Sequence, residues 1–452
     1  MLVIDGCYIA TVDAAGTEHE TGYLIVDGDL ITEVGPGPVP PEYAGGDLID
    51  GTGMLATPGL VNTHHHLCEW ITRGYATDDT LVGWLQALYP IWARLDPELV
   101  RASAAANLGW LALTGCSTTA DHHYVFPPAG GDLLEAEILA ARQIGLRFHP
   151  CRGSMNLGES AGGLPPDSVV EEHDEILAAT QAAIDRWHDP SFGSMLRVAV
   201  APCSPSSVTP ELMRDSAALA RRAGVRLHTH LAETAAEEAF CQATFGRTSA
   251  EYAEDLGWLG KDVWLAHCVH LSPAAVGRFA ATGTGVAHCP TSNGRLGAGI
   301  APVRALLEAG ASVGLAVDGA ASNESGRMID ELHQSVLAAR FSGGPQALGA
   351  RQALALATMG GADCLGRADE IGSLEVGKLA DVALWDVGGL GGSGIADPLA
   401  ALVLGAPVLD TLVVGGAAVV TGGRLVRADA ADLAAGAVWA SRAIAERVQA
   451  AT

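Results

Sequence analysis

The chain has 452 residues, of which 49% are hydrophobic and 17% charged, and its formal net charge is −26. This length and composition suit a compact enzyme with one large and one smaller domain, and they argue against disorder. The excess of acids disfavours nucleic acid and anionic membranes as partners, because phosphate groups are bound by clustered Lys and Arg.

The cysteines and the first residues indicate the compartment. The nine cysteines form no C-x-x-C pair and several lie within strand-like runs, so we interpret them as reduced thiols. The chain starts with MLVIDGCYIATVD, which alternates like a strand and lacks the basic segment of a signal peptide. No apolar stretch reaches the length of a membrane span. We therefore expect a cytoplasmic protein.

The two ends of the chain have strand-like patterns, whereas the central part alternates between helical and strand-like patterns. Residues 1 to about 55 and those after about 370 form short alternating runs with Gly-rich turns. Between them, Ala- and Leu-rich helical stretches alternate with eight β-branched runs, which predicts a (β/α)8 barrel over residues 58–370, although periodicity alone leaves a doubly wound sheet open. The eight runs are GLVNTHHH (59–66), STTADHH (117–123), RFHPCRG (147–153), RVAVAPCS (197–204), RLHTHLAE (226–233), VWLAHCVH (263–270), GTGVAHCP (283–290) and SVGLAVDG (312–319).

Polar residues stand at the carboxyl ends of these runs, where a barrel carries its active site. His64 and His66 end the first run, His230 the fifth, His267 the sixth and Asp318 the eighth. A catalytic metal needs three or four N or O ligands and one open position. We predict His64, His66, His230 and Asp318 as the ligands. Four other histidines of these runs are interpreted as packing or strand residues: His65, His122, His123 and His228.

The same ends of the runs supply groups that could handle protons. A bound metal can lower the pKa of water to about 7, and the attacking water must then lose its proton. We predict that Asp318 takes this proton and that His267 orients the nucleophile. Glu233 lies three residues after His230, close enough to reach a substrate ring nitrogen, and is predicted to shuttle protons.

Lysine usage predicts the number of metals. Related two-metal barrels often use a carboxylated lysine as the bridging ligand, and this chain contains two lysines, Lys261 and Lys378. Lys261 precedes the sixth run, at the opposite end of the predicted barrel, and Lys378 lies in the C-terminal segment. We therefore predict one divalent metal. Three imidazoles and a carboxylate suit Zn²⁺, Fe²⁺ or Mn²⁺, and we take zinc as the default.

Six segments together resemble the amidohydrolase superfamily, and more narrowly its single-metal aminohydrolase branch, over essentially the whole chain. The resemblance implies a barrel flanked by a β-sandwich built from both termini, here residues 1–57 and 371–452, and a homodimer or larger homo-oligomer. It implies the same ligands and proton-handling residues, and it places Asn323 among the substrate-binding residues. The segments are PGLVNTHHHL, HTHLAE, LAHCVHL, CPTSNGRLGAGIAPV, VDGAASNE and GSLEVGKLADVALWD.

Within that branch, TTADHHYVFP, RFHPCRGSM and VAVAPCSPSSV are most similar to bacterial 8-oxoguanine deaminases, with triazine hydrolases second. This similarity implies hydrolytic deamination of an aminated lactam heterocycle, of the 8-oxoguanine, guanine or isocytosine kind, with release of ammonia. One alternative is hydrolysis of a triazine or of another small amidine or guanidine-like compound. The other is a catalytically inactive scaffold, although such proteins typically lack metal ligands and all four are present here.

Four residues bear on the choice of substrate. Trp84 matches a tryptophan that lines the pocket in this family, while a core tryptophan would give the same pattern. Cys203 stands where adenosine-type deaminases have a histidine, which weakens adenosine and S-adenosylhomocysteine as substrates. After Leu67 we expect Tyr and Gln in 8-oxoguanine deaminases, but this chain has Cys68 and Glu69. If either side chain faces the pocket, we expect a shift toward smaller or more cationic substrates.

Overall fold

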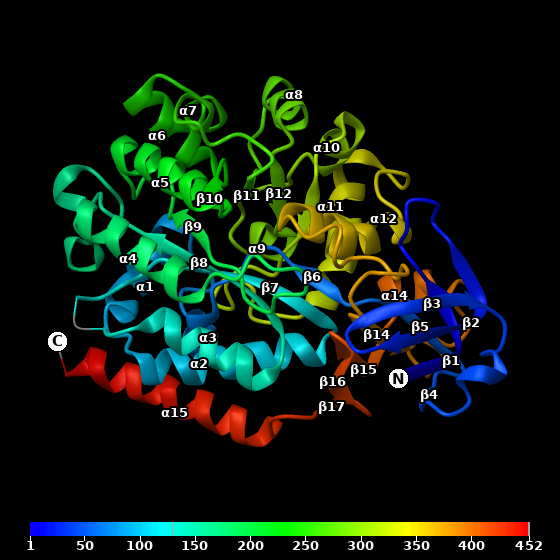
Figure 1. Cartoon of the computed structure of the whole chain (residues 1–452). Coiled ribbons are helices and arrows are strands. Elements are labelled where there is room, and N and C mark those ends of the chain that lie inside the picture. Colours follow the sequence, from blue (N-terminus) through cyan, green and yellow to red (C-terminus); the bar gives the residue numbers. More distant parts are fainter. Residues whose placement is uncertain (129, 451–452) are drawn as a thin grey trace.

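Eight parallel strands form the centre of the computed structural model, which describes residues 1–128 and 130–450 (Figure 1). Each of the eight predicted runs overlaps one of these strands, and the strands follow one another around a nearly closed barrel in chain order. The predicted barrel is therefore confirmed. Its strands are β6 (Leu60–Asn62), β7 (Cys116–His123), β8 (Arg147–Ser154), β9 (Ala199–Pro202), β10 (Leu227–Leu231), β11 (Val263–His267), β12 (Gly285–His288) and β13 (Val313–Leu315).

Hydrogen bonds at the carboxyl ends of the first and last strands join the two edges of the barrel. The backbone N–H of Thr63 donates to the carbonyl of Leu315 at 3.1 Å, and that of Asp318 donates to the carbonyl of His64 at 3.2 Å. These bonds join segments far apart in the chain. They also bring His64 and Asp318 to the same point of the rim.

Several helices around the barrel begin at residues that favour a helix N-terminus. Asp96-Pro97, Thr209-Pro210 and Ser272-Pro273 each place an oxygen-bearing cap before a proline, whose missing N–H is not needed in the first turn. The α-helices are α1 (Leu81–Trp92), α2 (Pro97–Leu113), α3 (Leu133–Ile144), α4 (His173–Trp187), α5 (Pro210–Ala223), α6 (Ala235–Phe245), α7 (Ser249–Asp255), α8 (Pro273–Thr282), α9 (Pro290–Arg295), α10 (Val303–Ala309), α11 (Met328–Gly343), α12 (Ala350–Ala355), α13 (Gly361–Cys364), α14 (Pro398–Leu404) and α15 (Ala430–Gln449). Short 3₁₀ helices cover Pro41–Tyr43, Leu67–Thr72, Glu159–Ala161 and Asp167–Val169, and a π-helical turn covers Leu356–Gly360.

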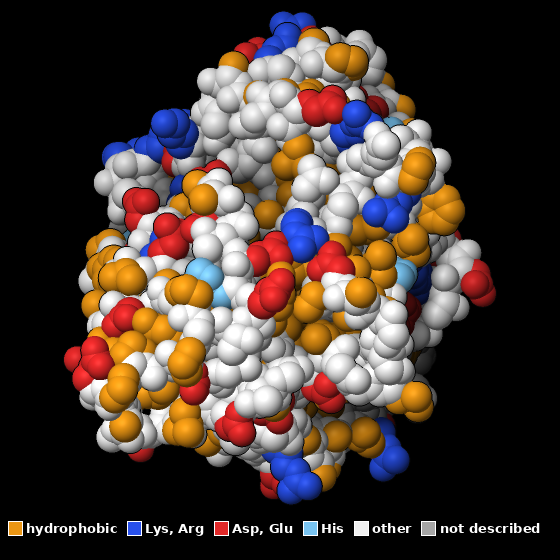
Figure 2. All heavy atoms as spheres, turned by 90° about the vertical axis from the view of Figure 1, so that its right-hand side faces the viewer, with side chains coloured by type: hydrophobic (Ala, Val, Ile, Leu, Met, Phe, Trp, Pro, Cys, Tyr) orange, Lys and Arg blue, Asp and Glu red, His pale blue; other side chains and the backbone are white. Residues whose placement is uncertain are grey.

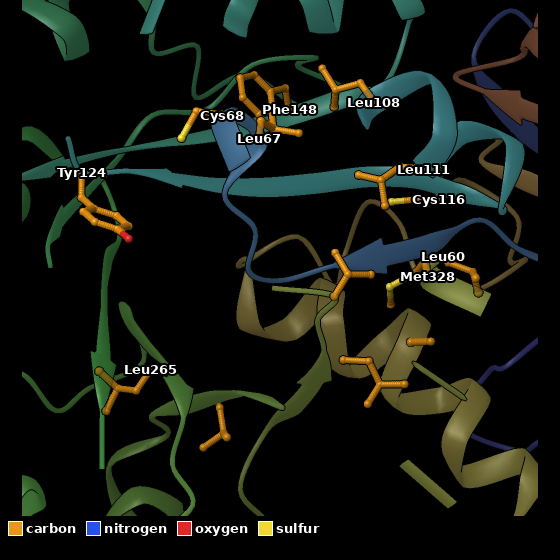
Figure 3. Packing of buried hydrophobic residues seen from close by; sticks show 14 of the residues in the cluster. Leu60, Leu67, Cys68, Leu108, Leu111, Cys116, Tyr124, Phe148, Leu265 and Met328 are labelled. Carbon is orange, nitrogen blue, oxygen red and sulfur yellow. The ribbon is translucent and has the colours of Figure 1, made fainter. Parts of the chain in front are cut away.

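Side chains alternate between the inside and the outside of the barrel, as strand geometry requires. Small residues such as Ala120, Ala199 and Ala266 belong to the inner cluster. Larger residues such as Leu227 and Phe148 belong to the outer cluster, which packs beneath the helices. Figure 3 shows part of this outer layer. The alternation decides which strand residues can reach the two mouths of the barrel.

A second sheet is built from both ends of the chain, as the resemblance implied. β5 pairs antiparallel with β14, with Pro58 opposite Val382, so segments from the two termini lie side by side (Figure 1). α15 instead runs along α2, on the outside of the barrel. The strands of this mixed sheet are β1 (Leu2–Ala10), β2 (Glu18–Asp27), β3 (Leu30–Pro36), β4 (Asp47–Asp50), β5 (Met54–Pro58), β14 (Val382–Asp386), β15 (Val408–Val414), β16 (Ala417–Thr421) and β17 (Arg424–Leu425).

A buried ion pair ties the barrel to this sheet. Arg147, at the start of β8, donates from Nε and Nη2 to the two carboxylate oxygens of Asp381 at 2.8 and 3.0 Å. Asp381 also accepts from the backbone N–H of Gly415 at 2.8 Å. Both charged side chains are almost fully buried, so the bidentate geometry is what makes their burial tolerable.

Three further features concern the thiols, the surface charge and the lengths of the helices. All nine cysteines are buried and free. On the face shown in Figure 2, Lys and Arg side chains lie in separate small groups rather than in one patch. In residues 1–128 and 130–450 no helix has both the length and the apolar character needed to traverse a bilayer.

Candidate active site

Four side chains predicted as metal ligands meet at the carboxyl ends of the barrel strands. The Oδ1 atom of Asp318 lies 3.2 Å from Nε2 of His64 and 3.3 Å from Nε2 of His66. The Nε2 atoms of His66 and His230 are 3.2 Å apart. All four residues are buried. The structure thus brings the predicted ligand atoms together at one point.

Backbone carbonyls fix the orientation of two of these rings. The Nδ1 atom of His66 lies 2.7 Å from the carbonyl oxygen of His122, and that of His230 lies 2.7 Å from the carbonyl oxygen of Cys203. A carbonyl can only accept, so each Nδ1 carries a hydrogen, and in the neutral form of each ring the lone pair of Nε2 faces the cluster. Two such lone pairs at 3.2 Å repel each other unless a proton or a metal ion lies between them.

The third ring is fixed through another histidine. Nδ1 of His228 donates to the carbonyl of Trp264 at 2.9 Å, which leaves Nε2 of neutral His228 as an acceptor. Nδ1 of His64 lies 2.7 Å from that atom and donates to it. Nε2 of His64 then points its lone pair at the cluster, where this buried atom has no hydrogen-bond partner among the described residues.

These observations fit a divalent metal. Three imidazole lone pairs and a carboxylate oxygen converge, and a buried nitrogen lacks a partner, which is the donor set of a mononuclear metal site. Ligand atoms close enough to hold an ion occur in the sets His64–His122–His230 and His64–His267–Asp318. His122 and His228, which the sequence analysis treated as strand residues, therefore lie within or directly behind the cluster.

Burial and the carboxylate set the charge states of the cluster. Burial holds the pKa of His64 and that of His230 well below their ordinary value. Burial alone would raise the pKa of Asp318, but His267 and the approach of His64 and His66 hold it well below its ordinary range. Burial lowers the pKa of His66, but the approach of Asp318 outweighs it and the pKa is raised to about 9. His64, His230 and Asp318 therefore already have the forms that bind metal, whereas His66 must release a proton when a metal binds.

Glu233 and His267 lie beside the cluster, as predicted. Nε2 of His267 is 3.9 Å from Oε2 of Glu233 and 3.8 Å from Oδ2 of Asp318. Nδ1 of His267 donates to Oδ1 of Asn293 at 2.9 Å, so Nε2 faces the two carboxylates. Burial lowers the pKa of His267, but the charges of Glu233 and Asp318 outweigh it and the pKa is raised. Burial raises the pKa of Glu233.

Glu237 holds the backbone that carries Glu233. Its carboxylate accepts from the N–H of Ala232 at 2.7 Å and from the N–H of Glu233 at 3.2 Å. Thr234 caps α6 by accepting from the N–H of Glu237 at 3.2 Å, so the sequence ETAAE forms a variant of the capping box that reaches back beyond the cap. Glu237 was not among the residues predicted from the sequence, although a Glu three positions after a capping Thr is a visible signal.

Unusual backbone conformations concentrate at this rim. Ala232, His267, Cys268 and Asp318 all adopt positive φ, between 49° and 69°. Such conformations are strained for residues other than glycine and persist where the surrounding structure enforces them. Here they occur where β10, β11 and β13 give way to the loops that carry the proton-handling groups.

A cavity of about 230 Å³ opens beside the cluster. Trp84 and Cys203 line it, as predicted, together with the aromatic rings of Tyr89, Tyr124 and Phe240. Among the described residues no Lys or Arg side chain lines this cavity. The described wall therefore offers no Lys or Arg countercharge to an anionic molecule.

Asn323 was predicted to contact the substrate, but its side chain forms hydrogen bonds within the protein. Its amide nitrogen donates to the carbonyl of Val317 at 2.9 Å and to Oε1 of Glu331 at 2.7 Å. Its oxygen accepts from the N–H of Gly326 at 3.3 Å. The residue is buried and absent from the described cavity wall, and it braces the loop that follows Asp318.

Cys68 and Glu69 also turn away from the cavity. Both lie on the short 3₁₀ helix Leu67–Thr72, and Cys68 belongs to the outer hydrophobic cluster with Leu67 and Phe148 (Figure 3). Glu69 is buried against the loop after Asp318, and burial raises its pKa to about 8. The described wall of the cavity includes neither side chain, so the condition for a shift in substrate is not met.

Neither lysine is near the cluster. Nζ of Lys378 donates to the carbonyl of Ala368 at 2.6 Å and to Oγ of Ser373 at 2.7 Å, beside the terminal sheet. Lys261 precedes β11, at the amino ends of the barrel strands, and lines a separate cavity there. A bridging lysine is thus absent from the described site.

A barrel with clustered histidines and a carboxylate at this rim defines a metal-dependent hydrolase. The chain belongs to the amidohydrolase family, which matches residues 55–419. It is 43% identical over 430 residues to 8-oxoguanine deaminase from Pseudomonas aeruginosa, covering 94% of this chain and 95% of that protein. It is 38% identical over 398 residues to hydroxydechloroatrazine ethylaminohydrolase from Pseudomonas sp. strain ADP, covering 82% and 80%. The crystal structure of atrazine chlorohydrolase TrzN from Arthrobacter aurescens TC1 complexed with zinc matches with a TM-score of 0.93 at 34% identity, covering 98% of this chain and 100% of that one.

Proposed function

We propose that this protein is a metal-dependent hydrolytic deaminase of an aminated lactam heterocycle, with 8-oxoguanine as the foremost substrate. The observation that carries the proposal is the position of Glu233 and His267, within 4 Å of each other, between the histidine cluster and the cavity. The likeness to 8-oxoguanine deaminase over 94% of the chain supports the choice of substrate.

We propose His64, His66, His230 and Asp318 as the residues that would hold one divalent metal. Zinc is favoured, since the structure of TrzN was determined in complex with zinc. When bound, such a metal supplies a Lewis acid that makes water nucleophilic near neutral pH. Elemental analysis of the purified protein should give close to one metal per chain, and His230→Ala should lose most of it. Two equivalents would contradict the argument from the missing lysine.

The residues of the chain supply the proton transfers. Water adds to the ring carbon that bears the exocyclic amine, and Oδ2 of Asp318 accepts the proton that the water loses. Glu233 gives a proton to the adjacent ring nitrogen, and the proton held by Asp318 passes to the departing amine. As the C–N bond breaks and ammonia leaves, the added hydroxyl gives its proton back to Glu233. Nε2 of His267, fixed by Asn293, orients the two carboxylates. The product carries a carbonyl where the amine was.

The cavity wall supports a neutral aromatic substrate. Trp84 is held by a hydrogen bond from its Nε1 to the carbonyl of Ala321 at 3.1 Å, so its indole is a fixed wall. Because no described Lys or Arg lines the cavity, a phosphorylated or carboxylated heterocycle would find no countercharge. The thiol of Cys203 replaces the histidine of adenosine-type deaminases, so adenosine and S-adenosylhomocysteine should be poor substrates.

A second candidate is hydrolysis of a substituted triazine, with release of an alkylamine or chloride through the same addition of water. The fold of TrzN and the 38% identity to hydroxydechloroatrazine ethylaminohydrolase favour this candidate. The two reactions differ in their leaving group, so product analysis separates them.

The test is a release assay across 8-oxoguanine, guanine, isocytosine, cytosine, adenine, adenosine, pterins and triazines, with ammonia, alkylamine and chloride measured in parallel. We expect ammonia release to be fastest with 8-oxoguanine. Fastest turnover of a triazine would replace the first proposal by the second. Turnover of adenosine within about tenfold of the best substrate, a difference of 1.4 kcal/mol, would overturn the inference from Cys203.

We further propose that the protein assembles as a homodimer or larger homo-oligomer, on the basis of its family resemblance alone. Sedimentation equilibrium of the purified protein tests this proposal. A monomer at micromolar concentration would contradict it.

A further inference from the structure

The opposite mouth of the barrel carries an unusual layer of basic side chains. Strand alternation places Arg147 and His149 of β8 on the same face as Cys151, which belongs to the inner cluster. Arg197, two residues before β9, and Arg226, just before β10, line the same cavity as His149. This end of a barrel is ordinarily filled by branched apolar side chains.

Few acids lie within ion-pair distance of the guanidinium groups in this layer. Arg147 is matched by Asp381, but the guanidinium groups of Arg197 and Arg367 share the single carboxylate of Glu370. Arg226 donates from Nη2 to the carbonyl of Cys364 at 2.7 Å and has no ion-pair partner among the described residues. Asp262 and Asp363 act on Arg226 from beyond ion-pair distance. Within ion-pair distance the layer therefore has more guanidinium groups than carboxylates, although the whole chain has a net charge of −26.

Several nitrogen atoms of this layer are buried without hydrogen-bond partners in the described chain. They are Nε2 of His149, Nε of Arg197, Nε of Arg226 and Nη1 of Arg367. His149 is 2% exposed and Arg367 is 1% exposed. Buried donors of this kind are rarely left unsatisfied, and several in one place are rarer still.

A cavity of about 280 Å³ lies among these groups, lined in part by His149, His188, Arg197 and Arg226. Nδ1 of His188 is occupied, because it accepts from the N–H of Val198 at 3.1 Å. Burial, followed by the charges of Arg367, Arg197 and Arg226, holds the pKa of His149 well below its ordinary value. The described lining of the cavity includes no carboxylate.

We propose that this cavity, at the amino ends of β8, β9 and β10, binds a small inorganic anion of the chloride or phosphate class. Arg226 and Arg197 supply the charge, and His149 and the unpartnered guanidinium nitrogens supply hydrogen-bond donors. The site lies at the opposite end of the strand from His230: four residues of extended chain separate Arg226 from His230, or about 13 Å. The bound anion would neutralise the basic layer at this end of the barrel, so anion binding should raise the stability of the folded protein.

The test uses the full-length protein dialysed into sodium gluconate, whose anion is too large for the cavity. Chloride or phosphate is then added at constant sodium, up to about 10 mM, a range in which general salt effects on apolar burial are small. We expect Tm to rise and then saturate, as it does when a ligand binds only the folded state. A rise with chloride alone assigns a halide site, and a rise with phosphate alone assigns an oxyanion site.

Two variants and one direct measurement make the test decisive. Arg226→Gln should lose the anion-dependent rise in Tm, whereas Arg221→Gln, which removes an equal charge from an arginine outside the cavity, should keep it. A wild-type Tm that responds to neither anion, or an equal rise in Arg226→Gln, would overturn the proposal. Crystals of the wild type soaked in bromide, with phosphate-soaked crystals in parallel, locate the anion without a variant. Density beside His149 and Arg226 supports the site, and density in neither soak overturns it.

Discussion

Replacing His228 by Phe tests how much a residue behind the metal ligands contributes to metal binding, because it leaves every predicted ligand in place. His228 is fully buried and stacks on Trp264 with ring centroids 4.5 Å apart and planes at 19°. Phe keeps a flat ring of similar size in this stack. It removes the acceptor that Nδ1 of His64 meets at 2.7 Å, and nothing else in the described surroundings bonds to that nitrogen.

Phe also loses the bond from Nδ1 of His228 to the carbonyl of Trp264, but the effect on metal binding follows from the bond to His64. A buried N–H left without an acceptor costs about 1–3 kcal/mol, and each 1.4 kcal/mol is a factor of ten in affinity. The free protein can relieve the cost by turning the ring or moving its proton. The metal-bound form cannot, because it needs the lone pair of Nε2. We therefore expect metal binding to weaken by about 10- to 100-fold, the range typical of the groups behind metal ligands.

The assay is competition for zinc between the protein and a chromophoric chelator, with thermal unfolding of the same samples to verify folding. His228→Gln is the matched control, since its amide oxygen can accept the hydrogen of His64 and should restore part of the affinity. A Phe variant that is folded and binds zinc within about twofold of the wild type would refute the reasoning, because even one ordinary hydrogen bond is worth more.

Further predictions concern three other side chains. Glu233→Gln should keep its metal while kcat falls by about 10²- to 10⁴-fold and KM changes far less, as measured by steady-state kinetics and elemental analysis on one preparation; loss of metal would make Glu233 a ligand. Glu237→Gln should lose one of its two backbone bonds and lower kcat on the order of tenfold with metal retained; unchanged kcat would remove its positioning role. Arg147→Met should lower the free energy of unfolding by about 3–5 kcal/mol in urea titrations, because it leaves Asp381 buried and unpaired, and adding Asp381→Asn should recover much of the loss.

The barrel could be predicted from the sequence because each of its strands has a recognisable local pattern. A short apolar run between helical stretches ends in a polar residue, and His64, His230 and Asp318 could be aligned by that rule alone. Parallel strands then bring their carboxyl ends to one rim without further information. Predicting the metal ligands therefore required only the alignment of the strand ends.

The roles of other residues depended on contacts that no local pattern encodes. His228 and His64 meet across the barrel, 164 residues apart in the chain, so the relay between them needs the closed barrel. Asn323 belongs to a motif beside Asp318, but its amide turns to Glu331, a contact set by how α11 packs. The 3₁₀ helix after His66 turns Glu69 away from the cavity, and no signal in the sequence predicts that turn.

The pairing of β5 with β14 has a consequence for the newly made chain. Pro58 leaves the ribosome long before its partner Val382, and at about 5–20 residues per second the delay is on the order of 15–65 s. Throughout that interval one edge of β5 is unpaired, and such an edge is prone to associate with other chains. The barrel strands emerge during the same interval, so the barrel can begin to form before the terminal sheet closes. Chains stalled on the ribosome before residue 382 should therefore be cleaved by protease within residues 1–58, and protection there should appear only after β14 and β15 have emerged. Protection of that segment in the shorter chains would show that the N-terminal strands fold without their distant partners.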